Sequence, residues 1–123
     1  MQKNVLGRIY EAQQFRKKVL ILSEHDLEAL PPEIGRLTKL VELDVSRNQL
    51  TSLPPEIGGL TSLTTLDVSN NGLTSLPPEI GLLTGLRKLF VDGNPLTSLP
   101  MEVEKLYKLK IFGASGNPLP NSG

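Results

Sequence analysis

A unit of 23 residues repeats along most of this chain. The block Leu-Pro-Pro-Glu-Ile-Gly begins at Leu30 and recurs at Leu53 and Leu76, 23 residues apart each time. A looser copy begins at Leu99, with Met101 in place of the second proline. A unit this short cannot bury its own leucines, so the copies must stack, each contacting mainly its neighbours. The repeat therefore predicts a solenoid.

Between these blocks runs Leu-x-x-Leu-x-Val-x-x-Asn-x-Leu, the first half of each repeat, which begins at Leu40, Leu63 and Leu86. A degenerate first copy spans residues 17–27, and a final copy spans residues 109–119. Apolar and polar residues alternate from residue 42 to residue 46, which predicts a strand with one buried face.

The residue at the Asn position is expected to turn the chain. A side-chain amide there can satisfy backbone groups of its own turn and of the neighbouring coil. This predicts a ladder of turn residues: His25, Asn48, Asn71, Asn94 and Asn117. The following Pro-Pro-Glu-Ile-Gly block predicts a short helical turn, with proline suited to its start and glycine to its end.

Composition narrows the possible functions. The 123 residues make one domain's length, with 24 leucines, 4% aromatic residues and no cysteine. The missing thiols exclude disulfides and thiolate metal sites. A formal net charge of zero argues against nucleic-acid binding, and no apolar run is long enough for a membrane span. Without a signal-peptide core or cysteines, the sequence favours a cytoplasmic location.

No catalytic, metal or cofactor motif stands out. His25 is the single histidine, and neither a G-x-S-x-G elbow nor a phosphate-binding glycine loop is present. A cation between Asp44 and Asp67 would have only two solvated carboxylates, a weak oxygen site. The sequence therefore predicts no enzyme activity, no metal and no cofactor.

The repeated motifs resemble the leucine-rich repeat proteins, in the 23-residue LPxEIGxL class found in intracellular Ras-group and bacterial members, over roughly residues 17–119. The resemblance implies an α/β fold: a right-handed, horseshoe-shaped solenoid with about five parallel strands on its concave face. Short helical or 3-10 turns would form the convex face. The family resemblance also implies protein–protein binding without catalysis.

Three segments are expected: a capping α-helix in residues 1–18, the repeats in 19–119 and a short tail in 120–123. Val5, Ile9 and Ala12 share a helical stripe that would cover the first coil, and Asn4 is a candidate N-cap. Five cations against one acid give residues 1–18 a net charge of +4, which leaves −4 for the rest. The alternative is a basic amphipathic helix that binds an acidic membrane surface or calmodulin.

The last repeat lacks its Leu-Pro-x-Glu half, so an open apolar edge is expected at Ile111, Phe112 and Leu119. Three explanations stay open: the chain is a piece of a longer protein, it associates through this edge as a homo-oligomer, or the tail folds back as a lid. The final repeat is also similar to closing repeats beside catalytic domains in mRNA deadenylase subunits, which leaves an accessory repeat domain as a further alternative.

The outward residues of the strands form the candidate binding surface. Asp44 and Asp67 should be lateral neighbours, and Phe90 would be a large apolar residue near Lys88. The alternatives are that the aspartates only solubilise the face and that Phe90 packs on its neighbours. The convex stripe of repeated glutamates is the weaker candidate. The predicted site, for a protein partner with basic and apolar character, comprises Glu42, Asp44, Arg47, Thr65, Asp67, Lys88, Phe90 and Asp92.

Overall fold

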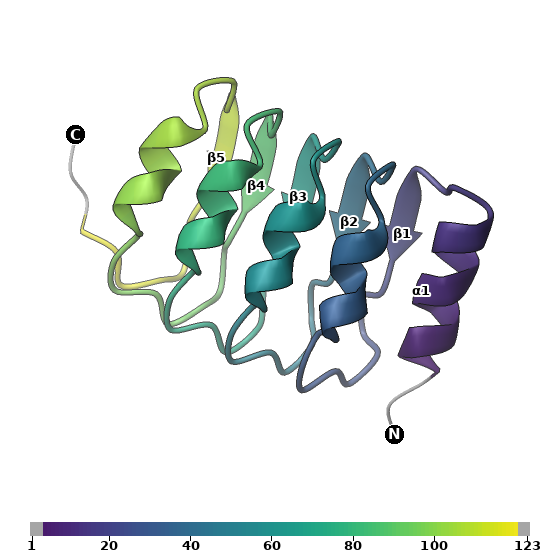
Figure 1. Ribbon diagram of the computed structural model, residues 1–123. Coiled ribbons are helices and arrows are strands. Elements are labelled where there is room, and N and C mark those ends of the chain that lie inside the picture. The colour runs from purple at the N-terminus through teal and green to yellow at the C-terminus, as the bar shows by residue number, and fades with distance from the viewer. Residues whose placement is uncertain (1–3, 121–123) are drawn as a thin grey trace.

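The computed structural model describes residues 4–120, so Lys3 and the last three tail residues lie outside it. A helix, α1 (Val5–Gln14), is followed by five stacked coils (Figure 1). The strands are β1 (Val19–Ile21), β2 (Glu42–Asp44), β3 (Thr65–Asp67), β4 (Lys88–Phe90) and β5 (Ile111–Gly113). The 3-10 turns are η1 (Pro32–Arg36), η2 (Pro55–Gly59), η3 (Pro78–Leu82) and η4 (Met101–Lys105).

The five strands form one parallel sheet in chain order, β1-β2-β3-β4-β5. Every pair keeps the 23-residue register, so Leu43 pairs with Leu66 and Leu66 with Leu89. The 3-10 turns line up on the opposite side of the coils, and the stack curves around the sheet (Figure 1). The predicted solenoid, with five parallel strands and short 3-10 turns, is confirmed.

The core is a continuous column of aliphatic side chains between the sheet and the 3-10 turns. The central residue of each inner strand is fully buried, as are Ile34, Ile57 and Ile80 from the turns. Burial of each such side chain contributes about 1.5–3 kcal/mol, so a regular column of this kind is stable without aromatic residues.

Helix α1 lies against the first coil and covers its open end (Figure 1). Val5, Ile9 and Ala12 are its buried residues, the stripe expected from the sequence. Asn4 occupies the N-cap position, but its side chain makes no capping hydrogen bond there. The helix is therefore held by apolar packing rather than by its cap.

The glycine of the Pro-Pro-Glu-Ile-Gly block does not end the 3-10 turn, and that expectation was wrong. Gly58 lies inside η2, which runs on to Gly59 and is followed by Leu60 at a negative φ of −81°. The glycines instead allow adjacent convex turns to approach closely. A Cβ on Gly81 would lie 2.7 Å from the carbonyl oxygen of Glu102.

We expect Gly81→Ala to lower the free energy of unfolding by about 1–3 kcal/mol, because η3 and η4 must separate to admit the methyl group. Gly85→Ala is the matched control, since its Cβ would meet only the carbonyl oxygen of Leu63, at 3.6 Å. Urea unfolding measures both variants. Equal midpoints would show that the close approach is not a constraint.

Candidate functional site on the concave strand face

Two rows of side chains cross the sheet on the face opposite the leucine column. One row is Val19, Glu42, Thr65, Lys88 and Ile111, and the other is Ile21, Asp44, Asp67, Phe90 and Gly113. The side chains in both rows are half-buried or exposed. The surface therefore has an acidic centre with apolar residues toward both ends.

Asp44 and Asp67 are lateral neighbours, as predicted. Each also holds its own turn: Oδ1 of Asp44 accepts the backbone N–H of Ser46 at 2.9 Å. Oδ1 of Asp67 accepts the backbone N–H and the hydroxyl of Ser69, at 3.0 and 2.6 Å. The carboxylates are thus structural acceptors as well as surface charges. Within residues 4–120, neither forms an ion pair.

Phe90 is half-buried rather than fully presented to solvent. Its ring packs over Gly113 on the next strand, where an added Cβ would lie 2.9 Å from Cδ1 of Phe90. Lys88 is exposed beside it. Both possibilities for Phe90 are therefore partly realised: one side of the ring packs on its neighbour, and the rest faces the concave surface.

Asp92 and Arg47 lie after the strands, at the edge of the surface. Oδ2 of Asp92 accepts the hydroxyl of Ser115 at 2.7 Å and its backbone N–H at 3.1 Å. These bonds, chiefly the one from the hydroxyl, lower the pKa of Asp92 despite partial burial. Arg47 is exposed and its Nη1 lies 3.4 Å from Glu24. An exposed ion pair of this kind contributes little to stability.

The residue three positions after the end of each strand has a left-handed backbone conformation. Glu24, Arg47 and Asn70 have φ near +57°, and Gly93 and Gly116 have φ of 71° and 74°. The sequence had suggested only a flanking column of side chains at these positions. A left-handed residue turns the chain out of each strand. Only the last two coils have glycine there, the residue that adopts this conformation most easily.

The side-chain amides of Asn48, Asn71, Asn94 and Asn117 form a ladder of hydrogen bonds along the stack. Nδ2 of Asn48 donates to the carbonyls of Leu22, Val45 and Ser46, while its Oδ1 accepts the backbone N–H groups of His25 and Leu27. Leu22, His25 and Leu27 belong to the preceding coil. Each amide therefore ties its own turn to the coil before it.

His25 stands at the first rung of this ladder, as predicted. Its Nδ1 lies 2.7 Å from the carbonyl oxygen of Ser23 and must donate, since that oxygen can only accept. Its Nε2 lies 3.2 Å from Nη1 of Arg8 and must accept. Arg8 also donates to the carbonyl of Ile21 at 3.0 Å. The capping helix thus supplies the contacts that an earlier coil would make.

The final coil presents an open edge. Ile111 and Phe112 are 45% and 39% exposed, although Phe112 stands where the inner strands bury leucine. Leu119 is half-buried and helps to line an open pocket of about 720 Å³ beside Phe112. Oδ1 of Asn117 is buried, with no hydrogen-bond partner in the described part of the chain.

Among residues 4–120, the structure brings together no group of three or more His, Cys, Asp or Glu side chains suited to a metal ion. Within the same residues, no helix has the length and apolar character needed to cross a membrane.

The stacked coils and their amide ladder define a leucine-rich solenoid. The family model for a leucine-rich repeat region matches residues 43–116, more than half of the chain. This chain belongs to the leucine-rich repeat proteins. Domains of this kind are in general protein-interaction modules. A comparison with curated proteins gives no match.

Several solved structures share the fold. A leucine-rich repeat protein of Leptospira interrogans is 35% identical, with a TM-score of 0.68, over 89% of this chain and 34% of its own. The leucine-rich repeat domain of the type III effector XopL is 32% identical, with a TM-score of 0.77, over 85% and 39%. The plant peptide hormone receptor RGFR1, in complex with RGF2, is 34% identical, with a TM-score of 0.76, over 89% and 18%. The chain therefore spans about two fifths or less of these structures.

We expect Asn94→Asp to lower the free energy of unfolding by about 3 kcal/mol or more. Asn94 is 1% exposed, and its Nδ2 donates to the carbonyls of Val68 and Val91, which a carboxylate would repel. Asn70→Asp, on the exposed neighbouring turn, is the control and should change stability little. Equal losses from both variants in thermal unfolding would contradict the role of the ladder.

Proposed function

We propose that this protein is an interaction module that binds a protein partner through the concave strand face. The observation that carries the proposal is the Asp44–Asp67 pair, two adjacent carboxylates without an ion-pair partner within residues 4–120. Residues 19–119 would form the binding unit, with 1–18 as its cap and 120–123 as a tail. Structural relatives include the plant peptide hormone receptor RGFR1, whose structure is a complex with RGF2.

The charge pattern supports a basic partner. Like charges on neighbouring strands destabilise a sheet mildly, and a cationic side chain placed over both carboxylates would remove that repulsion. Glu42 adds a third negative charge in the adjacent row. Thr65 lies beside it on β3 and carries no charge.

Apolar contacts would supply the rest of the affinity. Phe90 and Ile111 offer partly exposed apolar surface on one side of the acidic centre, and Val19 and Ile21 offer it on the other. Large apolar residues of this kind are common among binding hot spots. Lys88 would repel a second basic residue of the partner near Phe90, and this repulsion adds selectivity.

We expect Asp44→Asn with Asp67→Asn to reduce partner capture at least about tenfold while the fold is retained. Asparagine keeps the Oδ1 acceptor that each turn uses and removes only the charge. Immobilised wild type and variant are compared for proteins captured from a lysate of the source cells, with quantification by mass spectrometry.

Glu56→Gln with Glu79→Gln is the matched control, because it removes the same charge from the convex 3-10 turns. It should capture the same proteins as wild type. A captured set that is unchanged in the concave variant, or reduced equally in both variants, would refute the concave face as the site.

A second candidate function is self-assembly through the C-terminal edge. Three features of this edge favour it: exposed Phe112 at a core position, the adjacent open pocket, and Oδ1 of Asn117, which has no hydrogen-bond partner within residues 4–120. An edge strand with exposed apolar residues is a template for pairing with another strand. Since α1 covers the other end of the stack, two copies would meet edge to edge and form a closed dimer.

For this second candidate, sedimentation velocity at micromolar concentration should show a concentration-dependent dimer, and Phe112→Glu should make the protein monomeric. Leu82→Glu, at a residue 57% exposed on η3, is the control and should not change the dimer. A wild-type monomer at every concentration would exclude assembly through this edge.

A further inference from the structure

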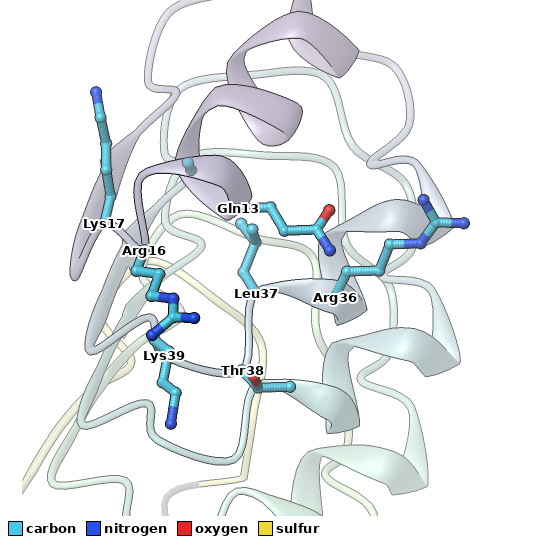
Figure 2. Close-up of a pocket in the computed structure, with 8 residues that line it drawn as sticks. Gln13, Arg16, Lys17, Arg36, Leu37, Thr38 and Lys39 are labelled. Carbon is cyan, nitrogen blue, oxygen red and sulfur yellow. The ribbon is translucent and has the colours of Figure 1, made fainter.

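A pocket of about 480 Å³ opens where the end of α1 meets the first coil. Its lining comes from two segments of the chain, residues 12–17 and residues 36–39. Figure 2 shows the side chain of Arg16 alongside that of Lys39, while Gln13 extends toward Arg36. We name these residues, together with Thr38, the cation pocket.

The cation pocket is built from hydrogen-bond donors and contains no carboxylate. Within residues 4–120, no ion pair involves Arg16, Arg36 or Lys39. Lys17 extends away from the others in Figure 2, and its Nζ lies 3.8 Å from Glu11. Arg16 and Lys39 lie side by side without an acid between them, and Arg36 lines the same pocket from η1. This arrangement favours an anion, and the guanidinium of Arg16 matches phosphate geometry closely.

An exposed apolar flank of α1 leads into this pocket. Leu6, Tyr10 and Gln13 follow the i, i+4, i+7 spacing and share one flank of the helix. Leu6 is 42% exposed and Tyr10 is 47% exposed. The opposite flank is occupied, because Arg8 bonds to the first coil there. Among the residues that the structure describes, the helix therefore caps the solenoid with one stripe and leaves another partly exposed.

We propose that this end of the molecule docks on an anionic phospholipid surface, with a lipid phosphate in the cation pocket and Leu6 and Tyr10 at the interface. The apolar flank selects a lipid over a soluble phosphate, because an apolar residue gains nothing from a hydrated ion. A tyrosine has an apolar ring and a polar tip, which suits the headgroup region.

The distribution of charge agrees with this orientation. Residues 1–18 carry a net charge of +4 and the remaining residues carry −4. An anionic surface would attract the capped end and repel the acidic repeats. Docking by this end would leave the concave face exposed, so the inference does not depend on the proposed function.

The test is co-sedimentation of the full chain with vesicles of phosphatidylcholine alone and of phosphatidylcholine with one-third phosphatidylserine. Binding is expected only to the anionic vesicles, and it should weaken as salt is added. Replacing Arg16, Arg36 and Lys39 with glutamine should lower the partition coefficient about 100-fold, at about fivefold per charge. Leu6→Ser with Tyr10→Ser should lower it about tenfold.

The control replaces Lys105, Lys108 and Lys110 with glutamine, the same charge change at the far end of the solenoid, and should retain binding. Thermal unfolding establishes that each variant is folded. Failure to bind anionic vesicles, or equal loss from both triple variants, overturns the proposal. Tight binding of soluble inositol hexakisphosphate without vesicle binding overturns the lipid as the ligand. Unchanged vesicle binding by the double variant Leu6→Ser with Tyr10→Ser also overturns the lipid as the ligand.

Discussion

The buried side-chain amide at the end of each strand is the interaction on which the rest of the structure depends. Nδ2 of Asn94 reaches a carbonyl 26 residues back and Oδ1 accepts N–H groups 23 and 21 residues back. One side chain thus fixes both the turn of its own coil and the offset to the coil before. The leucine column can form only because that offset is constant, since each leucine must meet its equivalent in the next coil.

The same interaction explains why the two ends differ. At the first rung, His25 bonds its own turn, and Arg8 of α1 supplies the contact from outside. Toward the other end the coupling weakens. The residue after the ladder asparagine donates to the preceding coil from Gln49 and Gly72, but Pro95 and Pro118 have no N–H to donate. The last coil therefore has fewer ties to its neighbour. Within residues 4–120, Oδ1 of Asn117 also has no hydrogen-bond partner.

The period of the sequence predicts the strands, their register and the amide ladder, because these depend on spacing alone. Contacts between coils that depend on backbone geometry could not be predicted in this way. The approach of Gly81 to Glu102 and the left-handed column that includes Arg47 are two examples. The cation pocket was also missed, since Arg16 and Arg36 line one pocket only because of the orientation of α1 on the first coil. The hydrogen bonds that Ser69 donates to Asp67 were also missed, although an Asp-x-Ser spacing could have suggested them.

The departures from the repeat near the concave face form one coupled set. Phe90 replaces the aspartate that bonds the turn in the two preceding coils, and Asp92 replaces the serine that such an aspartate would bind. The carboxylate of Asp92 bonds to Ser115 of the next coil instead. Both changes need Gly113, because a Cβ there would lie 2.9 Å from the Phe90 ring and 2.5 Å from Oδ1 of Asp92. Any one of these changes alone would leave a turn without its acceptor or create a clash. The acceptor for Ser115 therefore comes from Asp92 of the preceding coil, in place of the aspartate that Gly113 replaces.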